Sequence, residues 1–179
     1  MARHREQCDE TIPFGLKDAS LPTLCVHFRP HANLLTQTRE FVSSFCGTFI
    51  RDPDVVYRLS IAAHELLENA IKYSSDGATH MSVEVRSNER TSTISIRAEN
   101  RATRERIVAV RDTIDSIRGA ADPFALYCEM IRSSVERNEN SGLGLARIYV
   151  EADCALDYDV VDDAIAVSAR ISIDPENRP

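Results

Sequence analysis

The chain has 179 residues, of which 43% are hydrophobic and 27% are charged, a balance typical of one globular domain rather than of a disordered or membrane protein. Its formal net charge of −7 opposes binding to nucleic acid, and no continuous basic patch offsets that field. No stretch approaches the roughly 18 consecutive apolar residues of a membrane span. We therefore expect no nucleic-acid partner and no membrane.

The cysteines and the N-terminal segment indicate the compartment. The five cysteines are scattered without any Cys-x-x-Cys spacing, which predicts neither a disulfide framework nor a zinc site and favours a reducing compartment. Residues 1–21 are polar and loosely patterned, which predicts a flexible leader and no signal peptide. We expect a cytoplasmic protein in which residues 22–179 form a single domain.

Hydrophobic periodicity predicts the first elements after the leader. Residues 23–28 alternate apolar and polar side chains as a strand does, and residues 31–50 repeat apolar side chains at helical spacing. Residues 52–54, Asp-Pro-Asp, then supply a stop followed by a cap. They open a second helix that is expected to continue to about residue 75.

The second half of the chain begins with two alternating segments around a polar turn, which predict an antiparallel hairpin. The elements expected from there on are strands at 80–86 and 91–97, helices at about 103–118 and 123–137, a short helix through residue 152, and strands near 155–161 and 165–173. Helices segregated to one face of a mostly antiparallel sheet make an α+β protein with a two-layer α/β sandwich.

The second helix carries the most informative pattern in the sequence. Its apolar side chains fall on one side at about 100° per residue, and the other side gathers Glu65, Glu68, Asn69 and Lys72. Asparagine has poor helix propensity, so Asn69 in a helix interior needs a reason to be there. Glu65 lies one turn before Asn69, which places a carboxylate that can take a proton beside an amide oxygen that can ligate Mg²⁺.

Two other interpretations of this helix are open. Glutamate and lysine at spacings of three and four residues are what an ordinary solvent-exposed face shows, and the helix alone favours that alternative. His64–Glu65–Leu66 also resembles the start of a phosphoacceptor-histidine motif. The chain has no long second helix beside it to complete a dimerising hairpin, so this third interpretation is the weakest.

A second motif, Ser141–Gly142–Leu143–Gly144–Leu145, precedes the short helix. Glycines at such a position let a ligand approach the backbone, and the free amides of a helix N-terminus favour an anion such as phosphate. Turns of small residues before helices are common, so this turn alone favours a structural role. This turn follows the carboxylate–amide helix by about 75 residues, and the two motifs together are more informative about function than either motif alone.

With a hairpin and a helical insert between the two motifs, the chain resembles the GHKL ATPase superfamily, which has the histidine-kinase-like ATPase fold. Within it the chain looks like the small stand-alone serine kinases of the anti-sigma-factor type, over about residues 22–173. The resemblance implies ATP and Mg²⁺ as cofactors. It implies Glu65 as the general base and Asn69 as the Mg²⁺ ligand. It also implies residues 141–145 as the phosphate cradle and residues 101–140 as a mobile lid.

The sequence departs from the family in the first glycine box, which has the pattern Asp-x-Gly-x-Gly after the second hairpin strand. Asn100 stands where the aspartate would be, and no glycine follows it. An asparagine carbonyl can still accept a hydrogen bond from the adenine amino group, but without the charge assistance of a carboxylate. Lys72 lies one turn further along the polar stripe, either near the phosphates or in solvent.

The function implied by the resemblance is that of a Mg-ATP-dependent serine/threonine protein kinase acting on a small partner protein, sigma-factor-like or anti-anti-sigma-like, in a bacterial-type partner-switching pathway. Such a kinase works by positioning and charge neutralisation, with Glu65 orienting the attacking hydroxyl. The alternative, suggested by Asn100, is a degenerate ATPase fold that binds a regulator without catalysis. Small kinases of this type are often dimers, and the row of Phe41, Phe45 and Phe49 suits either a core or an interface, with the core favoured.

Overall fold

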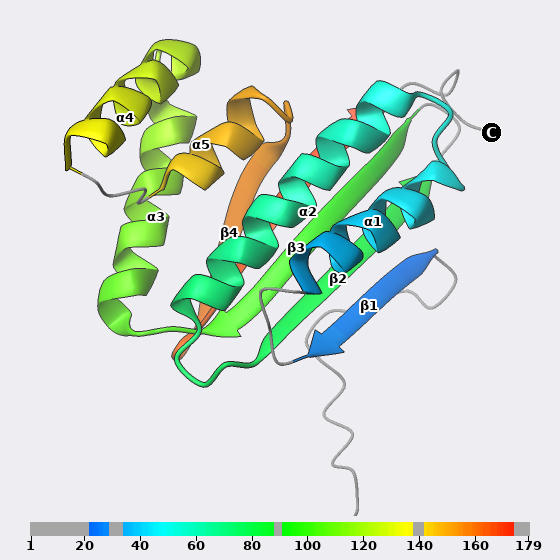
Figure 1. Ribbon diagram of the computed structural model, residues 1–179, viewed down its shortest axis with the longest axis horizontal. Helices are drawn as coiled ribbons and strands as arrows, with labels where there is room; N and C mark the ends of the chain where they lie inside the picture. Colours follow the sequence, from blue (N-terminus) through cyan, green and yellow to red (C-terminus); the bar gives the residue numbers. More distant parts are fainter. Residues whose placement is uncertain (1–21, 29–33, 88–90, 138–141, 174–179) are drawn as a thin grey trace, which may run out of the picture.

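The computed structural model describes residues 22–28, 34–87, 91–137 and 142–173. Five helices cover one face of a five-stranded antiparallel sheet (Figure 1). The elements are β1 (Thr23–Phe28), α1 (Leu34–Gly47), α2 (Pro53–Tyr73), β2 (Thr79–Ser87), β3 (Ser92–Arg101), α3 (Arg104–Gly119), α4 (Pro123–Arg137), α5 (Leu143–Val150), β4 (Ala155–Val161) and β5 (Ala164–Ile173). The predicted α+β fold, a two-layer α/β sandwich, is confirmed.

The strands follow the order β1-β2-β3-β5-β4, so the last strand of the chain lies between β3 and β4. Side chains alternate between the two faces of the sheet. On β3 the side chains of Ile94, Ile96 and Ala98 are buried under the helices, whereas Arg97 lies on the open face and forms an ion pair with Asp159. Asn100 continues the helix-facing series, and the register therefore points its side chain toward the helix layer.

The helix that carries the carboxylate–amide motif, α2, lies between α1 and α5 over the middle of the sheet (Figure 1). Asp52 caps it by accepting a hydrogen bond from the backbone amide of Asp54 at 2.9 Å, and Pro53 occupies its first turn. Its buried leucines include Leu66, which is 2% exposed. Burial of one such side chain contributes about 1.5–3 kcal/mol, so this face anchors α2 and fixes the direction of its polar flank.

One predicted boundary was wrong in a way that affects the site. The sequence placed the end of the second hairpin strand near Arg97, but β3 continues through Arg101. Its last residues pair with β5 in the register Asn100↔Ile165 and Arg101↔Ala164. These pairs extend the ladder through residues whose polar sequence is typical of a loop, and Asn100 is therefore held on a strand.

The phenylalanine row of α1 divides between core and surface. Phe45 and Phe49 pack against the core and against each other edge to face, with ring centroids 5.2 Å apart. Phe41 is 54% exposed. Core packing therefore accounts for two of the three rings, and a homodimer remains a prediction.

Other expectations concern thiols, the leader and membranes. Each cysteine of the described residues is a free thiol, namely Cys25, Cys46, Cys128 and Cys154. The predicted leader, residues 1–21, lies outside the described residues. No helix in the described ranges combines the length and the apolar character needed to cross a bilayer.

Candidate functional site

The two sequence motifs meet at a narrow pocket between α2, β3, α3 and α5. Four of the predicted site residues line it: Asn69 from α2, Asn100 from β3, and Gly142 and Leu145 from the start of α5. Most of the remaining wall is apolar and includes Leu66, Ala98, Val110, Ile165 and Val167. Segments distant in the sequence thus come together at one cavity with a few polar groups, as in many ligand sites.

Close approach of α5 to its neighbours depends on two glycines. A Cβ atom at Gly144 would lie 2.5 Å from Glu65 Oε2 and 3.6 Å from Asn69 Nδ2. Gly142 has φ of +81°, and a Cβ atom there would lie 2.9 Å from Thr113 Cγ2 on α3. Side chains at these positions would be strained or would displace the motif residues. The glycine turn therefore brings the first turn of α5 against both halves of the carboxylate–amide pair.

Asn69 has an unsatisfied amide. Its Nδ2 atom is buried and has no hydrogen-bond partner among the described residues. A buried polar group without a partner costs about 1–3 kcal/mol, so a ligand that supplies one would be favoured. Rotation of the amide by 180° would present its oxygen instead, and that oxygen is a suitable Mg²⁺ ligand.

The donor set fits a magnesium ion that is held partly by the ligand. The described residues contain no group of three or more His, Cys, Asp or Glu side chains that could hold a metal. Mg²⁺ commonly takes only one or two protein ligands and completes its octahedron with phosphates and water. Asn69, as a single amide-oxygen ligand, matches that small protein share.

The side chain of Asn100 points toward the helix layer and can accept a hydrogen bond from a nucleotide base. Its Nδ2 atom donates to the carbonyl oxygen of Arg101 at 3.0 Å, which leaves Oδ1 as the acceptor. One acceptor in an apolar slot suits a flat aromatic ring with an amino group.

The pocket is narrow in this structure. Its volume is about 50 Å³, well below the several hundred Å³ typical of ligand pockets. Arg106 of α3 stacks on the ring of Tyr73 of α2, 4.8 Å from its centroid, and both residues line the pocket. The pocket is too narrow for a purine in this arrangement, and an outward movement of α3 from α2 and β3 would widen it.

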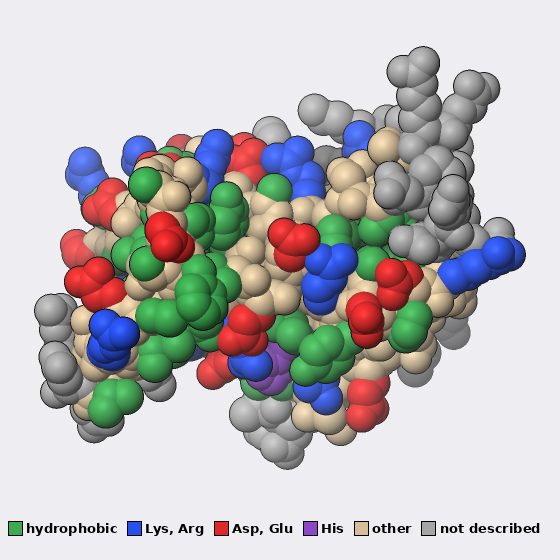
Figure 2. Space-filling view, turned by 90° about the horizontal axis from the view of Figure 1, so that it is seen from above, with side chains coloured by type: hydrophobic (Ala, Val, Ile, Leu, Met, Phe, Trp, Pro, Cys, Tyr) green, Lys and Arg blue, Asp and Glu red, His purple; other side chains and the backbone are tan. Residues whose placement is uncertain are grey.

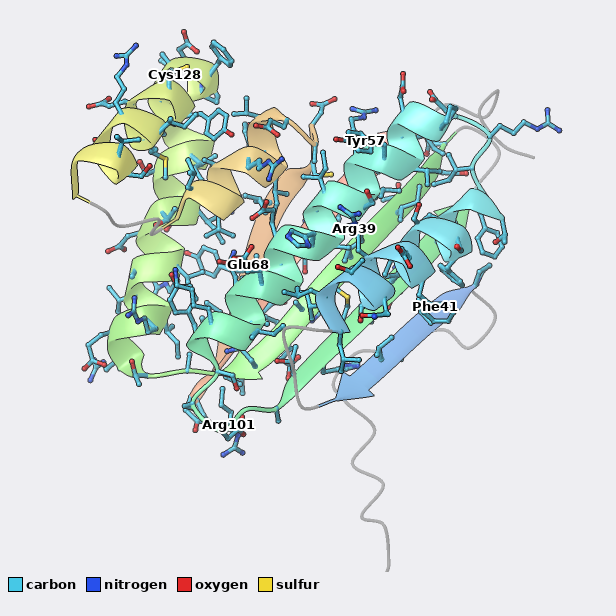
Figure 3. All side chains as sticks on the ribbon, in the orientation of Figure 1. Arg39, Phe41, Tyr57, Glu68, Arg101 and Cys128 are labelled. Atoms are coloured by element: carbon cyan, nitrogen blue, oxygen red, sulfur yellow. The ribbon has the colours of Figure 1, made fainter. Side chains whose placement is uncertain are left out.

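The polar flank of α2 is not a uniform solvated face. Glu65 is only 8% exposed, whereas Glu68 lies exposed on the helix surface (Figure 3). Lys72 is exposed too, with its Nζ atom 5.2 Å from the centroid of the Tyr73 ring, and it does not line the pocket. Contact between Lys72 and a phosphate therefore stays a prediction beside its solvent-exposed alternative.

The described residues that line the pocket include neither Leu143 nor Ser141 of the glycine motif. Leu143 is partly buried against the hydrophobic core. Ser141 lies outside the described residues. Their predicted contacts with phosphate, through the backbone at Leu143, remain predictions.

Sequence reasoning missed the direct partner of Glu65. Arg147 of α5 donates from Nη1 to Glu65 Oε1 at 2.9 Å and from Nε to Glu151 Oε2 at 2.7 Å. The hydroxyl of Tyr127, on α4, donates to Glu151 Oε1 at 2.5 Å. We call this chain of contacts, Tyr127–Glu151–Arg147–Glu65, the α4–Glu65 relay. The spacing of Arg147 and Glu151 on one helix was the only signal in the sequence.

The pKa values along the relay follow from these contacts. The hydrogen bond to Glu151 raises the pKa of Arg147. Burial opposes ionisation of Glu151, but hydrogen bonds from Arg147 and Tyr127 outweigh it and lower the pKa of that carboxyl. Burial, followed by the hydrogen bond to Glu151 and its charge, raises the pKa of Tyr127 to about 12. At neutral pH the relay therefore joins the neutral phenol of Tyr127 to an ionised Glu151 and a charged Arg147.

Glu151→Gln is expected to lower the pKa of Tyr127 from about 12 toward the ordinary value, because the variant removes the charge that opposes the phenolate. Burial still acts in the variant, so the pKa should stay above 10.0. Titration followed by the ¹³Cζ resonance of Tyr127 measures it. An unchanged pKa would show that the two groups are not in contact in solution.

Comparison with known proteins shows that the chain shares its fold with a solved structure. No family model and no curated protein matches the chain. A solved structure with a similar chain is that of the SiaB–SiaC complex from Pseudomonas aeruginosa, with a TM-score of 0.60 and 18% sequence identity over 84% of this chain and 88% of that one. At this level of identity the likeness shows a shared fold, here with a chain found in a complex of two proteins.

Proposed function

We propose that this chain is an ATP-binding regulatory protein that uses Mg-ATP to phosphorylate a serine or threonine of a small partner protein, as expected for a partner-switching kinase of the GHKL type. One observation carries the proposal: the unsatisfied amide of Asn69, the acceptor of Asn100 and the glycine turn of α5 all border one pocket. The shared fold with a chain of a two-protein complex supports a protein partner.

Each residue would have a distinct role. Asn69 would ligate Mg²⁺, whose charge would neutralise the triphosphate during transfer. The free amides at the start of α5 would hold phosphate oxygens. Asn100 Oδ1 would accept from the adenine amino group in the apolar slot. Glu65 would take the proton of the attacking hydroxyl.

The outer surface of α4 suits a protein partner. Phe124, Ile131 and Val135 are 63%, 38% and 78% exposed. Their spacing of seven and four residues places them along one side of the helix. Figure 2 shows hydrophobic side chains grouped at the end of the molecule that α4 and α5 occupy. Exposed apolar groups of this kind commonly mark protein interaction sites.

A second candidate function is a non-catalytic module that binds a regulator through its surface. Two observations favour it: the pocket is narrow, at about 50 Å³, and the carboxylate of Glu65 is already engaged by Arg147. In this case nucleotide would bind weakly or not at all.

Isothermal titration with Mg-ATP separates the two candidates. Under the proposed function we expect dissociation constants in the micromolar range and weaker binding of Mg-GTP, because guanine presents a carbonyl where adenine has the amino group that Asn100 would accept. Asn100→Asp should strengthen Mg-ATP binding about fivefold, since a charged acceptor contributes roughly 1 kcal/mol more than a neutral one. If neither the wild type nor Asn100→Asp bound Mg-ATP, the nucleotide site would be refuted and the non-catalytic binding module would be the remaining candidate.

A further inference from the structure

The contacts of Arg147 extend the candidate site beyond the two motifs. We propose that Arg147 is the positioning residue of Glu65, and that the α4–Glu65 relay makes the placement of this carboxylate depend on the position of α4. The significance of Glu65 for phosphoryl transfer rests on the proposed function. The coupling between α4 and Glu65 is a property of the fold and can be measured without nucleotide.

Glu65 needs a partner because of its burial. Its side chain is 10% exposed, and a buried carboxylate without a counter-charge is costly. Arg147 supplies that charge at 2.9 Å. On the other side, Glu65 Oε2 lies so close to Gly144 that a Cβ atom there would be 2.5 Å away. The carboxylate is thus held between a guanidinium and the backbone of α5, with little room for another orientation.

Arg147 in turn depends on the residues behind it. Its side chain is 42% exposed and would be free to turn into solvent if Glu65 were its only contact. Glu151 fixes the Nε side of the guanidinium, so the planar fork of Arg147 binds two carboxylates at once. Tyr127 is 8% exposed and fixes Glu151 from α4. Each bond orients the next, as in a cooperative network.

The relay connects a buried carboxylate to α4, the helix that also carries the exposed apolar residues. Tyr127 lies on the side of α4 that packs against α5, and Phe124, Ile131 and Val135 are exposed. Only residues 120–122 separate α4 from α3, and an outward movement of α3 would widen the pocket for a purine. Entry of nucleotide or contact with a partner would therefore change the position of Tyr127, and through Glu151 and Arg147 that of Glu65.

Hydrogen exchange of the nucleotide-free protein tests the coupling. Glu65→Gln removes the charge at the α2 end of the relay, and we expect the amides of residues 124–137 to exchange at least about threefold faster, as when a charge-assisted hydrogen bond is replaced by a neutral one. Glu68→Gln, on the exposed side of the same helix, is the matched control and should leave α4 unchanged. Unaltered exchange of α4 in Glu65→Gln would overturn the proposal.

The coupling can also be tested from α4 toward Glu65, by measuring hydrogen exchange of the side-chain Nε–H proton of Arg147. In Tyr127→Phe, the loss of the hydroxyl should weaken the hold on Glu151 and speed exchange of that proton. Tyr158→Phe is the control, because Tyr158 makes a similar bond to Asp115 at 3.0 Å outside the relay. Equal effects of the two variants on the Arg147 proton would also overturn the proposal.

A kinetic comparison addresses the positioning role. Arg147→Met should slow ADP formation from Mg-ATP about tenfold or more and leave the dissociation constant of Mg-ATP within about twofold, since the effect falls on the base. Arg147→Lys should recover part of the loss, because an ammonium can pair with Glu65 but lacks the planar fork. If Arg147→Met lost affinity for Mg-ATP in parallel with turnover, the positioning role of Arg147 would be refuted. Absence of Mg-ATP binding in the wild type would refute the proposed function instead, and the exchange measurements would still decide the coupling.

Discussion

Glu65→Gln is expected to slow the formation of ADP from Mg-ATP by about 10²- to 10⁴-fold, the usual effect of losing a general base. Glutamine keeps the shape of the side chain and can still accept a hydrogen bond from Arg147, but it cannot take up a proton. Binding of Mg-ATP should change little, because the proposed magnesium ligand, Asn69, and the base acceptor, Asn100, are intact. Turnover and affinity are measured separately, by a coupled ADP assay and by titration.

The matched control for this prediction is Glu68→Gln. Glu68 is on the same helix, is exposed, and lies 3.7 Å from His64 rather than in the relay. Its replacement should leave turnover within about twofold, in the range of an exposed ion pair. If Glu65→Gln retained wild-type turnover, phosphoryl transfer would need a different base, and the assignment of Glu65 would fail.

Gly144→Ala is expected to reduce both turnover and stability. The new methyl group would lie 2.5 Å from Glu65 Oε2, and the carboxylate would have to leave its place beside Arg147. Overpacking of a tight site typically costs about 1–3 kcal/mol, part of which the better helix propensity of alanine offsets. We expect the free energy of unfolding in urea to fall by about 1–2 kcal/mol and turnover to fall toward that of Glu65→Gln.

Gly119→Ala tests whether the effect is specific to Gly144. Gly119 ends α3, and a Cβ atom there would meet nothing within 4 Å. Its replacement should be neutral or should stabilise the protein by up to about 1 kcal/mol through reduced backbone entropy of the unfolded chain. Wild-type stability and turnover in Gly144→Ala would mean that Glu65 can move freely, which contradicts the close packing of α5 on α2.

The order and type of the elements could be predicted because each depends on local pattern. The alternation of the β3 segment and the helical repeat of α2 are properties of neighbouring residues. The meeting of Asn69 with the glycine turn was also predicted, through the resemblance to a known family. The fold class is confirmed, and Gly142 lines the same pocket as Asn69, whereas the roles of these residues remain predictions.

The features that were missed depend on contacts between distant segments. The ion pair between Arg147 and Glu65 joins residues 82 positions apart, and nothing near either residue specifies the other. The extension of β3 through Asn100 depends on its pairing with Ile165 rather than on its own polar sequence. The narrowness of the pocket depends on how α3 packs, which its helical pattern does not determine.

The insertion of β5 between β3 and β4 has a consequence for synthesis of the protein. Ile165 and Val167 of β5 form part of the pocket wall, although Asn69 and Asn100 precede them by at least 65 positions. On the ribosome, α2 and the β2–β3 hairpin emerge long before the strand that pairs with the free edge of β3. If the chain binds nucleotide as proposed, the complete pocket would form only after this strand had been translated and inserted between β3 and β4.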